Sequence, residues 1–427
     1  MQLVNPFTPS TIISDPDAFY GRDDEMQVLT RALQQGSIAI QGPVGIGKSS
    51  LLSRVLLHMD GFLSDVSSQI IIAVGHHDIK TVDDAARIIL EELCHVDSTQ
   101  RKLTIGIPKL ATYESQDANS FFETGRYLSA LIRILEDHPP PGTLDRVGYL
   151  VIAIDECDKC AKPIAQLMRQ LLTRFQLGGK DNLRFVVSGV SPFFDHMVNV
   201  DQGISRFIYK TLVVGKIDEE SSSSLLRDKL AIVRQRAVDD GIDMTIDPST
   251  IHRVLCLADG HPHLLQLLGS HLIEQENENP DNRIDSRDLL SALRRICYES
   301  RASVYNNILH SLECEGLLND FKILLQIAGR GFPTRIAKFK AQDLVSTECL
   351  EWLHQRNIIA DKDTHHYQLV DEFLRIRIIL DEEENITEAE RRLIEDDYQY
   401  YSRIASLAGN DNDDDALDYE ELMKNRY

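Results

Sequence analysis

The chain has 427 residues, 43% hydrophobic and 26% charged, a composition typical of a globular protein with about two or three cores. Its longest apolar runs are strand-sized and fall short of the roughly 20 residues that a membrane-spanning helix needs. The N-terminus has neither the basic nor the apolar region of a secretory signal. We therefore expect a cytoplasmic protein without a membrane span.

Acidic residues outnumber basic residues by 67 to 45, which gives a formal net charge of −22. Residues 381–427 contain sixteen acidic and five basic residues and so carry half of this charge. Such a field repels nucleic acid at long range, so any contact with DNA needs a local basic patch. Sequence-independent coating of DNA is therefore disfavoured.

The seven cysteines are scattered and odd in number, which predicts reduced thiols instead of a disulfide framework. Only Cys157 and Cys160 form a C-x-x-C pair, and no second pair of ligands at similar spacing lies nearby. A structural zinc site normally needs four ligands. Structural thiols are therefore favoured, and no metal site is assigned to cysteine.

Five β-rich runs alternate with helical patterns through the first half of the chain. Their continuous apolar character, as in YLVIAI and RFVVS, is typical of strands buried on both faces of a sheet. The runs are residues 37–41, 69–74, 149–154, 184–188 and 207–213. Between the second and third runs, helical periodicity predicts a helical insertion. The first 216 residues thus predict an α/β fold with a five-stranded, mostly parallel sheet.

Beyond Gly215 the β-rich runs stop and helical patterns follow, punctuated by Asp-Pro and Gly-His-Pro turns. These patterns predict an all-helical lid over residues 217–312. Over residues 313–380, three helical patterns and two β-rich halves around a polar turn predict a winged helix-turn-helix domain. The acidic residues 381–427 predict a helix followed by a disordered tail.

GPVGIGKSS at 42–50 matches the pattern G-x-x-x-x-G-K-[ST], with a β-rich run before it and a helical pattern after it. The glycines let backbone N–H groups point at phosphate oxygens beside a positive helix end. Lys48 would place its charge on the β- and γ-phosphates, and Ser49 would offer its hydroxyl to Mg²⁺. The residues predicted to hold ATP here are Gly42, Gly45, Gly47, Lys48, Ser49 and Ser50.

Two carboxylates follow the buried run YLVIAI, where they would face the phosphates. Asp155 is the predicted partner of Ser49 at the metal ion, and Glu156 is placed to orient and deprotonate the attacking water. Asp is also a common N-cap residue of a helix, which is the alternative for Asp155. With the phosphate loop upstream, the pair predicts hydrolysis as well as binding.

These motifs resemble those of the AAA+ and STAND group of P-loop ATPases, in particular the branch of origin-recognition initiators, over about residues 5–380. FYGRDDEMQVLTRAL at 19–33 resembles the motif on the adenine side of the site. The resemblance implies that Gly21 and Arg22 lie beside the base and ribose. A helix that begins near Asp23 is the alternative.

Two further roles are implied by the resemblance. RFVVSGV resembles the sensor 1 strand, so Ser188 would report on the γ-phosphate or the attacking water; a satisfied buried hydroxyl is the alternative. GISRFIYKTLVV resembles the segment with the arginine finger, so Arg206 would reach the γ-phosphate of a neighbouring copy in a homo-oligomer. A surface salt bridge is the alternative for Arg206.

ADGHPHLLQLLGSHL resembles the G-x-P turn of STAND lids. Related lids often carry an arginine here, whereas this chain has His261 and His263. His261, inside the turn, is the candidate for a phosphate contact, and a capping or packed histidine is equally compatible with the sequence. The missing arginine favours a slow switch over a processive motor.

The third predicted helix of the winged-helix region, TECLEWLHQ, has two glutamates and neither Lys nor Arg, which suits phosphate contact poorly. The basic run of Arg330, Arg335, Lys338 and Lys340 is better suited to a nucleic-acid backbone or an acidic partner. The overall charge favours a protein partner over DNA.

The sequence shows no H-E-x-x-H or G-x-S-x-G motif that would add a second chemistry. The resemblance therefore implies an ATPase switch that oligomerises and recruits a separately encoded effector protein, in bacterial antiviral defence or a mobile element. A DNA-binding initiator or loader that uses its winged helix is one alternative. A scaffold that binds nucleotide without hydrolysing it is another.

Overall fold

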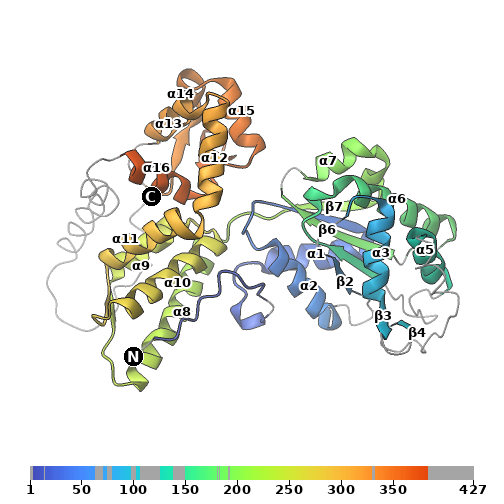
Figure 1. Cartoon of the computed structure of the whole chain (residues 1–427), viewed down its shortest axis with the longest axis horizontal. Coiled ribbons are helices and arrows are strands. Elements are labelled where there is room, and N and C mark those ends of the chain that lie inside the picture. The colour runs from blue at the N-terminus through green and yellow to red at the C-terminus, as the bar shows by residue number, and fades with distance from the viewer. Residues whose placement is uncertain are drawn as a thin grey trace.

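In the computed structural model, the described residues form two lobes, an α/β lobe and a helical lobe (Figure 1). The structure describes residues 3–13, 15–62, 71–74, 79–97, 102–105, 126–137, 150–179, 181, 183–190, 193–328 and 332–382. None of the helices in these ranges combines the length and the hydrophobicity needed to cross a bilayer.

The α/β lobe contains a five-stranded sheet in the order β2-β5-β6-β1-β7, and every pairing in it is parallel. Its strands are β1 (Ser37–Gln41), β2 (Ile71–Val74), β5 (Leu150–Ile154), β6 (Leu183–Gly189) and β7 (Ile208–Val213). The expected α/β fold with a parallel sheet is thereby confirmed. Because β7 is an edge strand, three of its six residues are exposed, unlike the strands buried on both faces that its apolar run predicts.

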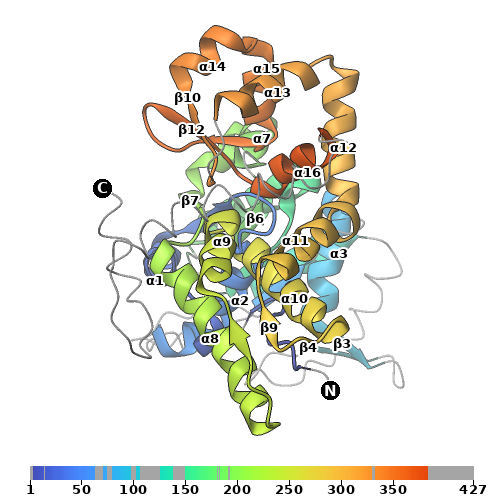
Figure 2. The same ribbon diagram turned by 90° about the vertical axis from the view of Figure 1, so that its left-hand side faces the viewer.

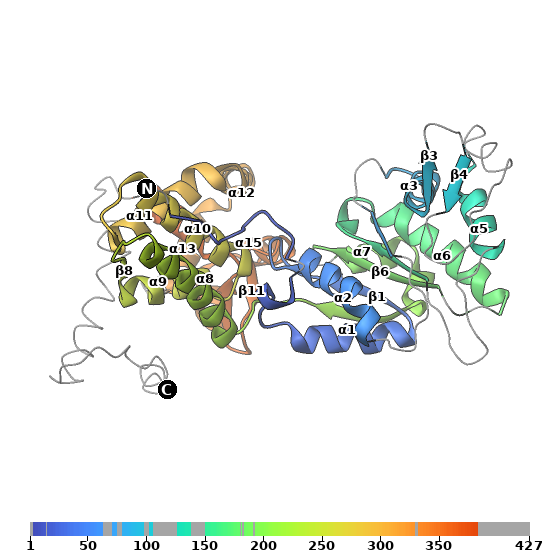
Figure 3. The same ribbon diagram turned by 90° about the horizontal axis from the view of Figure 1, so that it is seen from below.

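Helices cover both faces of the sheet, as alternation along the strands requires (Figure 3). In β1, Ile38 and Ile40 face one cluster while Ala39 faces the other. The first cluster includes α1 (Asp23–Gln35) and α2 (Lys48–Phe62), and the second includes α3 (Val82–Leu93), α6 (Ala161–Leu177) and α7 (Phe193–Val200). The sheet is therefore the middle of three layers.

The insertion between β2 and β5 differs from the all-helical segment that the sequence predicts. Its described part contains α3 and α5 (Tyr127–Asp137) but also an antiparallel pair, β3 (Cys94–Asp97) and β4 (Lys102–Ile105). Strands of four residues are too short to show a clear two-residue period, so the helical patterns on either side hide them. The remaining residues of the insertion lie outside the described ranges.

The helical lobe begins with α8 (Glu219–Asp239), α9 (Pro248–Ala258), α10 (Pro262–Glu278), α11 (Ser286–Arg295) and α12 (Ala302–Cys314). Side chains cap several of these helices: Asp218, Asp247 and Asp285 each accept a hydrogen bond from a first-turn amide. The Pro residues at the start of α9 and α10 fit a position that needs no backbone donor. The short parallel strands β8 (Thr245–Ile246) and β9 (Arg283–Ile284) were not expected.

Residues 317–382, here called the C-terminal module, are stacked on the end of the helical lobe that carries α12 (Figure 2). Its elements are α13 (Leu318–Ile327), β10 (Arg335–Ala337), α14 (Lys338–Leu344), α15 (Thr347–Gln355), β11 (Ile359–Asp361), β12 (His366–Leu369) and α16 (Glu372–Glu382). The strands form an antiparallel sheet in the order β10-β12-β11. The sequence prediction missed β10 and α16, and its helix and tail beyond residue 382 lie outside the described ranges.

One hydrophobic cluster runs through the helical lobe and the C-terminal module without a break. Tyr305 on α12, Phe321 on α13 and Phe373 on α16 are all fully buried in it. The core therefore crosses the position near residue 312 at which the sequence predicts a domain boundary.

The N-terminal residues 3–13, here called the strap, follow α10 along the helical lobe and then reach the α/β lobe. Phe7 is buried against Gly269 of α10, where an added Cβ would lie 2.3 Å from the ring. Along α10 the hydrogen bonds of the strap pair Leu3 with Asn277, Asn5 with Ser270, Thr8 with Gln266 and Pro9 with His263. The strap ends with the Ile13 amide donating to the Ser50 hydroxyl at 3.0 Å.

We expect Phe7→Ala to lower the free energy of unfolding by about 3 kcal/mol, because the ring would leave a cavity in the core of the helical lobe. Ile12→Ala is the matched control, since Ile12 lies in the same strap with a side chain that is 56% exposed. Urea denaturation of the two variants measures the difference. Equal midpoints for both variants would show that the strap does not contribute to the core.

Candidate functional site

The phosphate loop joins β1 to α2 and turns sharply at its glycines. Gly45 and Gly47 have φ angles of +77° and +95°, a region in which residues with a Cβ are strained. The loop leads into the first turn of α2, where backbone N–H groups have no partners within the helix. This backbone is suited to an anion with several oxygens.

Lys48, the first residue of α2, folds back over this loop. Its Nζ donates to the carbonyl oxygens of Gly42 at 2.9 Å and Pro43 at 2.7 Å. Burial lowers the pKa of Lys48, while the carboxylates of Asp155 and Asp158 act in the opposite direction. The ammonium is therefore held inside the loop by backbone oxygens, which a phosphate oxygen could replace.

Asp155 follows β5 and joins three elements through its carboxylate. Ser49 Oγ, on α2, donates to one carboxylate oxygen at 2.5 Å, and Ser188 Oγ, on β6, donates to the other. Ser188 is fully buried, and β6 lies beside β5 in the sheet. The structure thus brings Ser49, Asp155 and Ser188 together as a set of oxygen ligands of the kind that Mg²⁺ prefers.

Glu156 is adjacent to this set but has a different partner. Its backbone is in the left-handed region with φ of 53°, which is unfavourable for a residue with a Cβ and is common at functional sites. Its carboxylate forms an ion pair with Lys159 at 3.2 Å, and both side chains are more than half exposed. An exposed pair of this kind contributes little to stability and opens readily.

Arg22 is buried and binds backbone carbonyl groups and a neighbouring carboxylate. Nη2 donates to the carbonyl oxygen of Ile46 at 3.0 Å and to that of Gly215 at 2.6 Å, while Nη1 pairs with Glu25 at 2.7 Å. Gly21 adjoins Ser221 at the start of α8. Gly21 and Arg22 therefore lie between the phosphate loop and the beginning of the helical lobe, and the guanidinium of Arg22 binds backbone carbonyl groups.

His261 caps α10 and contacts the phosphate loop directly. Its Nδ1 accepts from the Leu264 amide at 3.4 Å, which leaves Nε2 to donate to the carbonyl oxygen of Val44 at 3.1 Å. Burial lowers the pKa of His261 to about 3, and the positive charge of Arg301 adds to this effect. At neutral pH His261 is thus an uncharged donor that links the helical lobe to the loop backbone.

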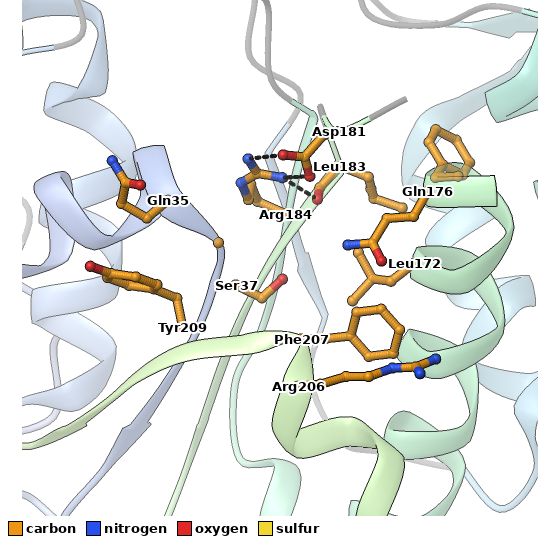
Figure 4. A pocket seen from close by; sticks show the side chains of 12 residues that line it. Gln35, Ser37, Leu172, Gln176, Asp181, Leu183, Arg184, Arg206, Phe207 and Tyr209 are labelled. Atoms are coloured by element: carbon orange, nitrogen blue, oxygen red, sulfur yellow. Dashed lines mark hydrogen bonds and ion pairs between the residues drawn. The ribbon is translucent and has the colours of Figure 1, made fainter. Parts of the chain in front are cut away.

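Arg206 lies at the opposite end of the sheet from its own phosphate loop, because it precedes β7 whereas the loop follows β1, and the two strands are parallel. It lines a pocket of about 160 Å³ together with Gln35 and Tyr209 (Figure 4). The guanidinium lies 4.6 Å from the centre of the Phe207 ring, and the side chain is exposed. Arg206 is therefore too far from its own loop to serve it.

Cys157 and Cys160 are both buried, and burial raises the pKa of each thiol, that of Cys160 to about 11. Among the described residues, no group of three or more His, Cys, Asp or Glu side chains is arranged to hold a metal ion.

Sequence reasoning missed two residues, one beside the site and one in the segment that leads from β7 to the helical lobe. Asp158 accepts a hydrogen bond from the Val190 amide at 3.1 Å, next to the end of β6. Lys216 binds Asp259 at the end of α9. The position of Asp158, three residues after Asp155, was an available signal, whereas no pattern in the sequence singles out Lys216.

The strand, glycine loop and helix around Lys48, with a carboxylate at the end of a neighbouring strand, define a P-loop NTPase. The model of the family described as Novel STAND NTPase 1 matches residues 12–404, and the chain belongs to this family. The expected relation to STAND ATPases is thereby confirmed. The sequence matches none of the curated proteins.

Several solved structures resemble the chain over most of its length, among them the following two. The Aeropyrum pernix ORC2 protein in its ADPNP and ADP complexes aligns with a TM-score of 0.54 and 12% identity, covering 91% of this chain and 100% of that one. A Walker-type ATPase of Pyrococcus abyssi aligns with a TM-score of 0.51 and 17% identity, covering 86% and 98%. At these identities the likeness supports the fold.

The stability of the chain should depend on pH through His261. Its pKa of about 3 in the folded state lies below the value near 6.5 of an unfolded chain, so between these values the unfolded state binds one more proton. Its contribution to stability is therefore lost as pH falls through this window, by up to about 1.4 kcal/mol per pH unit. Between about pH 6.5 and about pH 5, the wild type should lose roughly 2 kcal/mol more than His261→Gln.

Urea denaturation at several pH values measures this difference. His196→Gln is the control, because His196 is exposed on α7. Parallel pH profiles for the wild type and His261→Gln would contradict the assigned protonation state.

Proposed function

We propose that the protein is an ATP-binding and ATP-hydrolysing switch in which the state of the phosphate loop controls the helical lobe. The observation that carries this proposal is the direct hydrogen bond from His261, on the helical lobe, to Val44 in the loop. In this proposal residues 1–216 are the ATPase core, 217–312 the lid, 313–380 a winged-helix domain, and 381–427 an acidic tail.

The residues of the loop fit a triphosphate with Mg²⁺. Backbone N–H groups and Lys48 would bind the phosphate oxygens, with Ser50 beside them at the start of α2. Ser49 and Asp155 would hold Mg²⁺, which when bound would neutralise charge on the phosphates. In the adenine-side motif, Gly21 would lie near the base, and Arg22 would support the loop through its hydrogen bond to the Ile46 carbonyl oxygen.

The carboxylates divide the chemistry between them. Asp155, held by Ser188, would keep a fixed position at the metal, while Glu156 would leave its exposed pair with Lys159 to accept a proton from the attacking water. Because Ser188 donates a hydrogen bond to Asp155, its hydroxyl would also lie near this water. Hydrolysis in this scheme is slow and regulatory, because His261 supplies no positive charge to the phosphates.

Nucleotide binding would also change the hydrogen bonds that hold the phosphate loop. A phosphate oxygen at Lys48 would compete with the carbonyl oxygens of Gly42 and Pro43, to which the ammonium donates in this structure. Val44, the next residue, carries the carbonyl that His261 binds. The position of the helical lobe would thus follow the state of the nucleotide.

Arg206 supports assembly of several copies, because it is exposed and lies far from its own loop. In an oligomer it would approach the γ-phosphate held by a neighbouring copy. The assembled form would then recruit a separately encoded effector protein, in a bacterial defence or mobile-element system. The composition supports a protein partner here, since the chain is strongly acidic.

The alternative of a DNA-binding initiator gains no support from the C-terminal module. On α15 the exposed Glu348 and Glu351 would repel phosphates. Lys338 is already paired with Asp361 at 2.6 Å, and Arg330 lies outside the described residues. Arg335 and Lys340 remain, which is a small basic surface for a duplex.

We expect Lys48→Ala to weaken ATP binding by roughly 10- to 100-fold, because a charged hydrogen bond to the phosphates is lost. Glu156→Gln should bind ATP normally but hydrolyse it at least about 100-fold more slowly. Calorimetric titration and phosphate release measure the two effects. Lys162→Ala, at an exposed site on α6, is the control, and unchanged ATP affinity in Lys48→Ala would overturn the assignment of the site.

A mixing experiment tests Arg206. Arg206→Ala should reduce hydrolysis by about 10³-fold or more, and addition of inactive Lys48→Ala copies should restore part of it, because their Arg206 reaches the intact loops. Arg169→Ala, at a nearby exposed arginine, should change little. If mass measurement finds only monomers with and without a slowly hydrolysed ATP analogue, the assembly step is wrong.

A further inference from the structure

The segment between β7 and α8, residues 214–218, is here called the linker, and it is hydrogen-bonded on both sides. Toward the α/β lobe, the Val214 amide donates to the carbonyl oxygen of Gln41 at 2.8 Å, at the end of β1. Toward the helical lobe, the Ile217 amide donates to the carbonyl oxygen of Gly260 at 2.8 Å. The linker therefore touches both the strand that precedes the phosphate loop and the turn that carries His261.

Arg22 connects the phosphate loop to this linker. Its Nη2 donates both to Ile46 in the loop and to Gly215 in the linker, and its side chain is 4% exposed. A buried carbonyl oxygen that loses its donor is destabilised, and the effect is larger when that donor is charged. The guanidinium of Arg22 therefore binds the phosphate loop and the linker at the same time.

Lys216, the next residue of the linker, connects it to the C-terminal module. Its Nζ pairs with the carboxylate of Asp259, at the end of α9, and donates to the carbonyl oxygen of Leu369 at 3.0 Å. Leu369 is the last residue of β12. The Lys216 side chain is only 16% exposed, so water screens this charge weakly.

A buried carboxyl group of the module is influenced by the charge of Lys216. Glu372, the first residue of α16, accepts hydrogen bonds from the Thr334 amide at 2.8 Å and the Thr334 hydroxyl at 2.5 Å. Burial raises the pKa of Glu372 to about 7, and the nearby charge of Lys216 acts to lower it, whereas that of Asp259 acts to raise it. Lys216 therefore contacts the module through the Leu369 carbonyl oxygen, and its charge also acts on the Glu372 carboxyl group.

We infer that Arg22 and Lys216 are positioning residues that couple the phosphate loop to the C-terminal module through the linker. The connection runs from Ile46 to Arg22, from Arg22 to Gly215, and from the adjacent Lys216 to Leu369. The transmission of nucleotide state along this connection rests on the proposed function, because it needs a loop that changes when nucleotide binds. The physical link between the loop and the module exists without nucleotide, and it is tested without nucleotide.

The module has a second attachment, which allows the connection to be broken without unfolding the chain. Arg301, in front of α12, forms an ion pair with Asp371 at 2.9 Å, and the Tyr305 hydroxyl donates to the same carboxylate at 3.1 Å. Loss of the Lys216 contacts should therefore loosen β12 and the start of α16 while the module stays on α12.

The test is amide hydrogen exchange of the full chain without nucleotide, read at residues 366–382. Lys216→Met should exchange roughly tenfold faster there than the wild type, because a charged hydrogen bond to Leu369 is lost. Lys216→Arg, which keeps a charged donor, should restore most of the protection. Lys210→Met, at an exposed lysine of β7, should leave it unchanged.

Arg22 supplies the decisive comparison, since its partners Ile46, Gly215 and Glu25 lie outside the module. Arg22→Lys replaces the two nitrogens Nη1 and Nη2, which bind Glu25 and the two carbonyl oxygens, by one nitrogen on a shorter side chain, and should also speed exchange at residues 366–382. A purely local role would speed exchange only at the phosphate loop and the linker. In the double variant Arg22→Lys with Lys216→Met, exchange should match Lys216→Met alone within about twofold. Additive effects, or no effect of Arg22→Lys at residues 366–382, would overturn the coupling.

A second arm adds a slowly hydrolysed ATP analogue. The wild type should change its exchange at residues 366–382, and Lys216→Met should bind the analogue with similar affinity but lose this change. Retention of the change in Lys216→Met would also overturn the coupling. Failure of the wild type to bind the analogue would count against the proposed function alone, because the nucleotide-free arm decides the coupling by itself. Arg31→Met, at an exposed arginine of α1, is the control for Arg22→Lys.

Discussion

The carboxylate of Asp155 is the point on which the site depends. It accepts hydrogen bonds from Ser49 on α2 and from Ser188 on β6, so one side chain fixes three elements relative to one another. An ionised group at the end of a buried sheet is tolerated only when its oxygens have such partners. Because β5, β6 and β1 are adjacent and parallel, their carboxyl ends meet at one edge, where the phosphate loop begins. The order of the strands thus determines which side chains can act together.

Much of the fold was predictable because burial leaves a plain trace in the sequence. Strands covered on both faces must be apolar throughout, and β1, β5 and β6 appear as continuous apolar runs. The strand β7 was also predicted to be buried on both faces, but it is an edge strand and three of its six residues are exposed. Short elements such as β3, β4 and β10 were missed because three or four residues cannot establish a period. The sequence predicted a domain boundary near residue 312, yet the hydrophobic core of the helical lobe continues across this position into the C-terminal module.

The chemistry of the site was predictable only where it depends on local sequence. The motif around Lys48 and the acidic end of β5 are recognisable from the sequence, since the backbone and side chains that would bind phosphate and metal are neighbours in the chain. Arg22, His261 and Lys216 act through backbone carbonyl oxygens of distant segments, and a carbonyl carries no residue-specific signal. The neutral state of His261 likewise depends on burial and on Arg301, which only the folded arrangement supplies.

The strap has a consequence for the order in which a nascent chain can fold. Thr8 binds Gln266, which is separated from it by 258 residues, and Phe7 belongs to the core that α10 completes. At about 5–20 residues per second, a ribosome needs roughly tens of seconds to make that partner. The sheet of the α/β lobe, whose last strand ends at Val213, is synthesised in the meantime. Phe7 and Thr8 can therefore pack only after α10 has been made, when the strands of the described sheet have already been synthesised.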